Sequence, residues 1–221
     1  MDPQHWLKRW ENQQIGFHQD RINTHLESFW PQSSINHGCR VFVPLCGKSL
    51  DMLWLRAQGH EVLGVELSRK AVAEFFSDND LKVTVEKNER FEYWSCEGLT
   101  LLVGDFFDLQ AGDLAGCRAV YDRASLIALP PSMRIDYVRH MTTIIPAGTV
   151  TLLISMEYPQ TQMAGPPFSV EEDEVHALYD GNYQIELLHT MDVLAENPRF
   201  RERGLTRLGE KVYRLIVDSQ R

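Results

Sequence analysis

The sequence predicts an α/β fold in which a mostly parallel β-sheet is covered by helices on both faces. From Arg40 onward, short apolar runs alternate with segments of helical periodicity. The last two apolar runs differ, because no obvious helix separates them. With 221 residues, of which 43% are hydrophobic, the chain can form one large domain with a sizeable core.

Five buried strands are expected along the first three quarters of the chain. The first begins at Arg40 and ends at Pro44, because proline cannot continue a hydrogen-bonded ladder. The others are predicted at Glu61–Glu66, Leu99–Val103, Ala119–Asp122 and Thr149–Ile154.

Helices are predicted between these strands and before them. One covers Lys48–Gln58 and ends at Gly59, a second begins after the capping residue Ser68, and a third lies around Met133–Ile144. Residues 1–37 form a separate helical segment ahead of the α/β core, residues 38–221.

Two strand-like runs, Ile185–Val193 and Lys211–Val217, follow near the C-terminus. The residues between them, Asn197–Gly209, lack an obvious helix, so the two runs could pair antiparallel at the sheet edge.

Composition excludes several classes of partner. A net charge of −9 disfavours nucleic acids and anionic membranes. No secretory signal is visible, and the four cysteines form no CxxC pair, so we expect reduced thiols and a cytoplasmic location. A monomer is the default expectation. His18 and Asp20 lie close together without further ligands at metal spacing, so no metal site is predicted.

A cofactor site is predicted at the carboxyl ends of the strands, where ligands bind in open parallel sheets. The turn at residues 44–49 follows the first strand, Glu66 ends the second, and Asp105 follows the third. A carboxylate at the position of Glu66 can accept hydrogen bonds from both hydroxyls of a ribose. The turn holds the single glycine Gly47 and lacks the glycine pattern that approaches a pyrophosphate, which favours S-adenosylmethionine over NAD or FAD. Alternatively, Gly47 is only a turn residue and Glu66 a solvated carboxylate.

At these residues the chain resembles the thiopurine S-methyltransferase family. The resemblance is carried by an ordered set of motifs over nearly the whole chain: residues 41–48, 59–68, 107–109, 121–124, 165–168 and 210–213, together with 6–10 and 17–19. It implies a Rossmann-like, three-layer fold of the class I methyltransferases, with a seven-stranded sheet, an antiparallel C-terminal edge strand and an N-terminal helical lid.

The resemblance also implies an activity. A methyl group would pass from S-adenosyl-L-methionine to the sulfur of an aromatic or heterocyclic thiol such as a thiopurine, leaving S-adenosyl-L-homocysteine. A reduced selenium or tellurium species, or another small thiol, is an alternative acceptor. Other classes also stay open: a nucleotide-dependent oxidoreductase on the same architecture, and a non-catalytic protein that binds S-adenosylmethionine.

Site residues follow from the resemblance, position by position. It implies that the cofactor is bound by Trp10, Leu45, Glu66, Asp105, Phe106 and Arg123. Our own hypothesis is that Arg123 and Arg199 hold the thiolate form or the ring nitrogens of the acceptor by charge-assisted hydrogen bonds, and that Phe17 and Phe168 form walls for a flat acceptor ring.

Structural interpretations of the same residues remain. Trp6 and Trp10, four residues apart, fit the apolar stripe of a core helix. Phe17 and Phe168 could be core aromatics, and Asp122 with Arg123 could form a structural ion pair.

Overall fold

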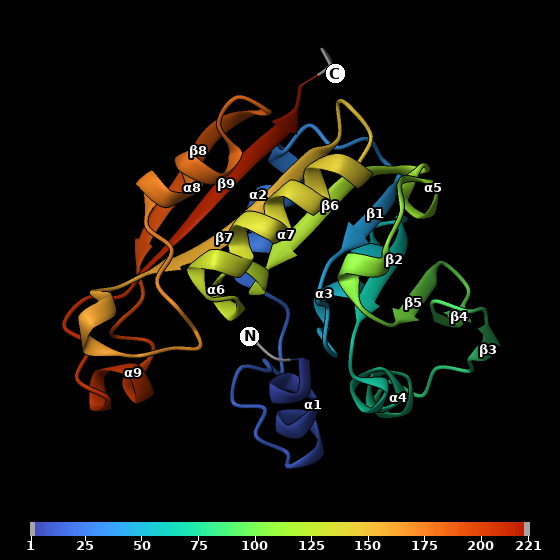
Figure 1. The fold of residues 1–221 in the computed structure, drawn as a ribbon, viewed down its shortest axis with the longest axis horizontal. Coiled ribbons are helices and arrows are strands. Elements are labelled where there is room, and N and C mark those ends of the chain that lie inside the picture. Colours follow the sequence, from blue (N-terminus) through green and yellow to red (C-terminus); the bar gives the residue numbers. More distant parts are fainter. Residues whose placement is uncertain (1–2, 219–221) are drawn as a thin grey trace.

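The protein folds around one nine-stranded β-sheet, seen in a computed structural model that describes residues 3–218 (Figure 1). The strands follow the order β3-β4-β5-β2-β1-β6-β7-β9-β8. Their bounds are β1 Arg40–Val43, β2 Glu61–Glu66, β3 Thr84–Lys87, β4 Glu92–Cys96, β5 Leu99–Val103, β6 Cys117–Arg123, β7 Val150–Glu157, β8 Tyr183–Asp192 and β9 Gly209–Val217.

The five central strands, β5-β2-β1-β6-β7, are all paired in parallel. Because β4 and β9 are each antiparallel to both of their neighbours, these two strands are reversed and the other seven point one way. Strand β1 pairs with β2 on one side and with β6 on the other, so the strand order reverses at β1. This topological switch point is where an open α/β sheet binds its ligands.

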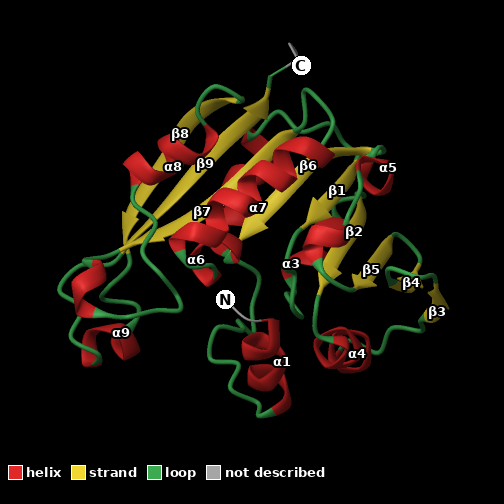
Figure 2. Cartoon of the chain, in the orientation of Figure 1, coloured by secondary structure: helices red, strands yellow, loops and turns green. Residues whose placement is uncertain are grey.

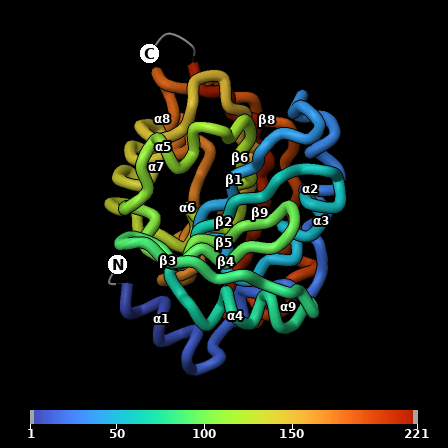
Figure 3. Tube along the Cα trace, turned by 90° about the vertical axis from the view of Figure 1, so that its right-hand side faces the viewer, coloured from blue at the N-terminus to red at the C-terminus, as the bar shows by residue number. Residues whose placement is uncertain are grey.

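Helices cover both faces, which gives three layers (Figures 1 and 3). Helices α5 (Ala111–Leu114), α6 (Ser125–Ala128), α7 (Pro131–Ile144) and α8 (Glu172–Tyr179) lie on one face, and α2 (Thr24–Phe29), α3 (Asp51–Ala57) and α4 (Arg69–Asp78) on the other. The remaining elements are α1 (Pro3–Glu11), α9 (Pro198–Glu202) and the 3-10 turns η1 (Trp30–Gln32), η2 (Phe106–Asp108) and η3 (Gln160–Gln162).

Successive side chains of a strand point to opposite faces of the sheet, so each central strand contributes to a hydrophobic core on either face. In β1, Val41 and Val43 pack toward α2 and α3, whereas Phe42 packs toward α7. All three side chains are buried, as expected of a central parallel strand that is covered on both faces. The capping prediction for α4 is confirmed, since the Ser68 hydroxyl accepts a hydrogen bond from the Ala71 amide over 3.2 Å.

The structure differs from the sequence prediction at both ends of the sheet. Strands β3 and β4 extend the predicted seven strands to nine, since they form a hairpin that pairs with β5. The last strand, β9, does not lie at the edge: it inserts between β7 and β8, and β8 is the edge strand. The stretch between β8 and β9 also contains the short helix α9, where no helix was evident.

The N-terminal segment divides between two places. Helix α1 lies apart from the sheet layers, beyond the carboxyl ends of the central strands (Figure 2). Helix α2 packs instead in the core on the face of the sheet that α2, α3 and α4 cover. There Leu26 of α2 and Trp30 of η1 are buried together with Val41 and Leu152. Only the part before Asn23 therefore covers the sheet end. Among the described residues, no helix is long and apolar enough to cross a membrane.

Candidate functional site

The turn after β1 forms the floor of the candidate site. Leu45 and Gly47 both have positive φ angles, of 44° and 53°. The tight turn is fixed from β2, because the Cys46 amide donates to the Val65 carbonyl over 3.0 Å and the Gly47 amide donates to Oε2 of Glu66 over 2.9 Å. The backbone of Leu45 is thereby held at the carboxyl end of β1, as the turn motif predicts.

Glu66, at the end of β2, is a buried carboxylate with a defined set of hydrogen bonds. Its Oε1 accepts from the Ser68 amide over 2.7 Å, while its Oε2 accepts from Gly47. Burial raises the pKa of Glu66, and the amide hydrogen bonds oppose that shift. Two carboxylate oxygens offer about four lone-pair sites, so roughly two acceptor sites remain for a ligand. Glu66 is therefore not the solvated carboxylate of the alternative interpretation.

Three aromatic rings of the N-terminal segment cover this turn. The ring of Phe17 lies between those of Trp6 and Trp10, with centroids 5.5 and 5.4 Å away and edge-to-face geometry. Trp10 is 3% exposed, and its indole lies against Gly47. The two tryptophans are thus part of one aromatic cluster over the turn.

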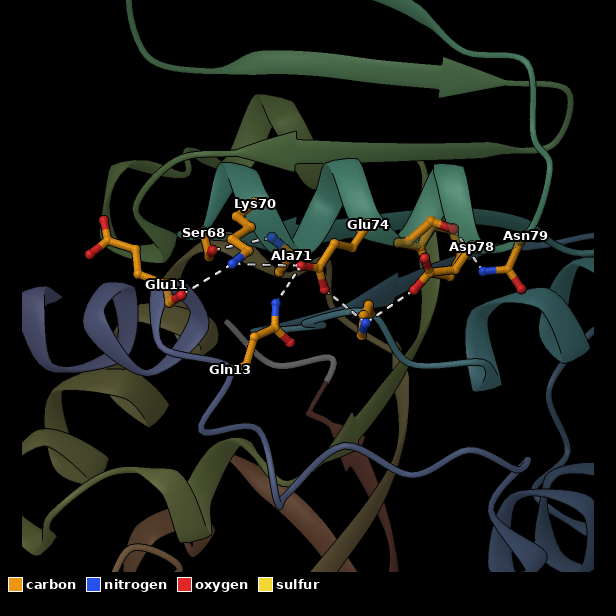
Figure 4. A network of polar contacts seen from close by, with 10 residues as sticks. Glu11, Gln13, Ser68, Lys70, Ala71, Glu74, Asp78 and Asn79 are labelled. Carbon is orange, nitrogen blue, oxygen red and sulfur yellow. Dashed lines mark hydrogen bonds and ion pairs between the residues drawn. The ribbon is translucent and has the colours of Figure 1, made fainter.

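Polar contacts attach the segment to α4 (Figure 4). The Gln13 amide donates to Oε1 of Glu74 over 2.9 Å, and Lys70 donates to the Glu11 carbonyl over 3.2 Å. From the turn, Lys48 donates to Glu74 over 2.8 Å and to Asp78 over 3.0 Å. Side chains of α4 therefore contact both the turn and the cover, which is the N-terminal segment before Asn23.

Arg123, at the end of β6, is held in a buried polar cluster. Its Nε donates to Oδ2 of Asp51 over 2.8 Å, and its Nη2 donates to the Ser49 hydroxyl over 3.0 Å. Asp51 is fully buried and also accepts from the Tyr121 hydroxyl over 2.8 Å and the Asn23 amide over 2.8 Å. The ion-pair partner of Arg123 is therefore Asp51, and not its sequence neighbour Asp122.

Asp122 points to the other side of β6, toward α7. The Tyr137 hydroxyl donates to its Oδ2 over 2.7 Å. Burial raises the pKa of Asp122 to about 6. The ring of Tyr137 packs against that of Phe106, with centroids 4.7 Å apart and an interplanar angle of 32°. The neighbouring Asp105 caps η2 by accepting from the Phe107 amide over 2.9 Å.

Of the two predicted site residues nearest the C-terminus, Arg199 contacts the N-terminal segment, whereas Phe168 packs within its own loop. An Nη1 hydrogen of Arg199, on α9, is donated to the Gly16 carbonyl, and its guanidinium lies 4.9 Å from the centroid of the Phe200 ring. Phe168 donates its amide to the Ile127 carbonyl over 2.7 Å and packs on Gly165. From this loop, Pro166 and Pro167 line the cavity described next, and Phe168 is not among its lining residues.

A cavity of about 340 Å³ joins these features at the carboxyl ends of the strands. Its walls include eight of the nine predicted site residues: Trp10, Phe17, Leu45, Glu66, Asp105, Phe106, Arg123 and, at the α9 side, Arg199. Its volume falls in the range of small-molecule sites.

Asp51, Ser49, Lys48 and His18 were not assigned roles from the sequence. Asp51 could not be recognised because it opens a helix, and only the tertiary fold brings it beneath Arg123. His18 follows directly after the predicted Phe17 and lines the same cavity, so its place in the motif was the available signal.

The donor and acceptor groups fit S-adenosylmethionine. Glu66 keeps acceptor sites for a ribose diol, and Phe106, Leu129, Met133 and Tyr137 supply a largely apolar wall suited to a flat base. The backbone of the turn needs no glycine-rich approach to a phosphate, since this cofactor has none.

Solved structures share the fold. A TehB-like SAM-dependent methyltransferase from Corynebacterium glutamicum superposes with a TM-score of 0.54 at 15% identity, covering 96% of each chain. A SAM-dependent methyltransferase from Methanosarcina mazei gives a TM-score of 0.60 at 12% identity, covering 90% of this chain and 99% of that one. At such identities the likeness concerns the fold alone.

The fold and the cavity define a class I methyltransferase that uses S-adenosylmethionine. The sequence profile described as "Thiopurine S-methyltransferase" matches residues 1–218. A thiopurine S-methyltransferase from Nitrosospira multiformis is 50% identical over 217 residues, covering 98% of this chain and 99% of that protein. One from Pseudomonas fluorescens is 48% identical over 215 residues, covering 97% and 99%. The chain belongs to the thiopurine S-methyltransferase family.

Proposed function

We propose that the enzyme transfers the methyl group of S-adenosyl-L-methionine to the sulfur of aromatic or heterocyclic thiols such as thiopurines. The observation that carries this proposal is that the buried acid Glu66, the cation Arg123 and the aromatic rings of the N-terminal segment line the same cavity. The names of the relatives, which are thiopurine S-methyltransferases, agree with a thiol acceptor.

Five residues would hold the cofactor beside Arg123: Trp10, Leu45, Glu66, Asp105 and Phe106. Glu66 would accept the ribose hydroxyls, and Leu45 would contact the cofactor through its backbone in the turn. Trp10 would close over it from the cover, and Asp105 and Phe106 would flank the adenine. The bound cofactor supplies an electrophilic methyl group on a sulfonium.

The contribution of the protein is then mainly position and desolvation, since displacement at a methyl carbon requires the acceptor sulfur in line with it. Arg123 is suited to hold an anionic sulfur or a ring nitrogen by a charge-assisted hydrogen bond. Two of its five N–H groups bind Asp51 and Ser49, which fixes the plane of the guanidinium.

The remaining predicted residues take supporting roles in this proposal. Phe17 offers a ring to a flat acceptor, with Pro166 and Pro167 on the loop that also carries Phe168. Arg199 would reach the acceptor from α9 while its contact with Gly16 ties α9 to the cover.

We further propose that the chain works as a monomer and as one domain in the cytoplasm. The four free cysteines suit a reducing compartment.

A panel of matched acceptors tests the proposal. The enzyme is incubated with labelled S-adenosylmethionine and 6-mercaptopurine, adenine or hypoxanthine, which differ at position 6 of the purine ring. We expect methyl transfer to the thiol alone. Transfer to adenine or hypoxanthine at an equal rate would contradict a thiol-specific site.

A further inference from the structure

One histidine lines the cavity among the residues that the structure describes, and the function above gives it no task. His18 follows Phe17 on the cover segment, and its cavity also contains Arg123 and Lys48. No hydrogen bond joins its imidazole to another described side chain. Its ring nitrogens are thus available to a ligand, as far as the described residues are concerned.

The backbone at His18 is fixed from several directions. Its amide donates to the Ile15 carbonyl over 2.8 Å, which closes a turn. Phe17 is clamped between Trp6 and Trp10, and the Gly16 carbonyl accepts from Arg199. An imidazole on so well-held a turn is positioned as a catalytic group requires.

The two carboxylates that line the cavity in the described part of the chain already accept hydrogen bonds from backbone amides. Glu66 accepts hydrogen bonds from two backbone amides, and Asp105 accepts one from the Phe107 amide. Neither is placed as His18 is, beside the cations Arg123 and Lys48.

The hydroxyl and thiol groups of the cavity are poor proton acceptors. Tyr121 and Tyr137 donate to Asp51 and Asp122, and burial raises both tyrosine pKa values well above normal. Burial also raises the pKa of the Cys46 thiol well above its usual value, which keeps it protonated. His18 is the nitrogen base that remains in this part of the cavity.

Burial and the neighbouring cations favour the neutral form of the His18 imidazole. Burial, then Lys48 and Arg123, lower its pKa below the usual 6.5, while Asp20 on its own segment and Asp78 on α4 act in the opposite direction. A neutral imidazole at physiological pH can accept a proton, which an imidazolium cannot.

We propose that His18 accepts the proton of a neutral thiol acceptor while Arg123 stabilises the thiolate that forms. The S–H bond breaks, its proton moves to a ring nitrogen of His18, and the electron pair stays on sulfur. The thiolate sulfur then bonds to the methyl carbon as the bond from that carbon to the sulfonium sulfur breaks, and the electron pair of that bond remains on the departing thioether. His18 afterwards releases its proton to water. This inference rests on the proposed function, because it requires a thiol acceptor.

The dependence of rate on acceptor acidity tests the role of His18. Wild type, His18→Gln and the exposed control His176→Gln are compared at pH 7.5 with benzyl mercaptan, which is neutral there, and with 4-nitrothiophenol, which is ionised. We expect His18→Gln to lose about 10²-fold in kcat/KM with benzyl mercaptan but little with 4-nitrothiophenol. An equal loss with both acceptors, or a loss with neither, would overturn the inference.

Wild type alone separates this inference from the proposed function. If wild type methylates neither thiol, the proposed function fails; if wild type is active and His18→Gln loses nothing selectively, only the role of His18 fails. A second measurement avoids turnover: the imidazole signal of His18, assigned by its loss in His18→Gln, is followed by NMR in the S-adenosylhomocysteine complex. At pH 7.5 the signal should lie at the position of the neutral imidazole, and a signal at the imidazolium position would overturn the role of His18 as proton acceptor.

Discussion

Trp10 lies so close to Gly47 that a Cβ atom on Gly47 would come within 3.2 Å of Cζ2 of the indole. The cover and the cofactor turn are thus in van der Waals contact at a position where the backbone φ is 53°. A side chain at Gly47 would be strained and would also displace Trp10.

Gly47→Ala should therefore weaken both the fold and cofactor binding. An L-residue in this conformation costs about 1–2 kcal/mol, to which displacement of the indole adds. Urea unfolding and titration with S-adenosylhomocysteine measure the two effects. The control is Gly112→Ala on α5, where a Cβ meets no atom within 4 Å. That variant should be neutral or slightly more stable, and equal behaviour of the two would refute the contact.

Glu66→Gln should weaken binding of S-adenosylmethionine by about 10- to 100-fold, since a hydrogen bond to a charged group contributes about 1.5–3 kcal/mol. The amide oxygen can replace only one of the two carboxylate oxygens that accept from Gly47 and Ser68. Calorimetric titration measures the affinity. Glu61→Gln on the same strand is exposed and should bind normally, and an unchanged affinity in Glu66→Gln would exclude the ribose contact.

Arg123→Ala should lower kcat/KM by about 10²-fold, the value of a charge-assisted hydrogen bond to the acceptor. It should also lower the free energy of unfolding by about 3–5 kcal/mol, because Asp51 is left as a buried charge without its cation. Arg123→Lys keeps the charge but loses the planar fork, so it should recover stability more than turnover. Equal recovery of both would contradict the need for the planar guanidinium at the acceptor.

The stability of the protein should fall as pH rises through the titration of Asp122. Burial raises its pKa from 3.8 to about 6, so the folded state holds a proton there that the unfolded state has lost. The contribution is complete below about pH 4 and is lost by about pH 6, a change of about 3 kcal/mol. Asp122→Asn cannot titrate, and its stability relative to wild type should increase over this range in urea unfolding at a series of pH values.

The exposed variant Asp80→Asn serves as the control for the pH series. Its difference from wild type should be nearly constant between pH 4 and 7. If Asp122→Asn behaves in the same way, Asp122 is ionised normally in the folded state.

The central strands could be predicted because burial on both faces makes them continuous apolar runs. Leu99–Val103 and Glu61–Glu66 were predicted with the observed bounds. The β3–β4 hairpin was missed because β3 is exposed along its length and carries Thr84, Glu86 and Lys87. No hydrophobic period marks such a strand, and only its pairing with β4 stabilises it.

The candidate site was partly predictable for a similar reason. Glu66 and Arg123 each end a strand, so the α/β topology brings them to one end of the sheet without further information. The partner that orients Arg123 comes from a distant segment: it is Asp51, at the start of α3, which also accepts from the backbone amide of Asn23 at the N-cap of α2. Contacts of this kind depend on side-chain packing across the layers, which periodicity does not reveal.

The central claim is that the enzyme methylates the sulfur of a thiol acceptor, and the position of the transferred methyl group tests it most directly. Purified enzyme is incubated with S-adenosylmethionine labelled with ¹³C in the methyl group and with 6-mercaptopurine, beside a reaction without acceptor. The account predicts a single product whose ¹³C methyl group is bonded to sulfur, identified by NMR. A methyl group on a ring nitrogen, or no product from a folded enzyme that binds S-adenosylhomocysteine, would contradict it.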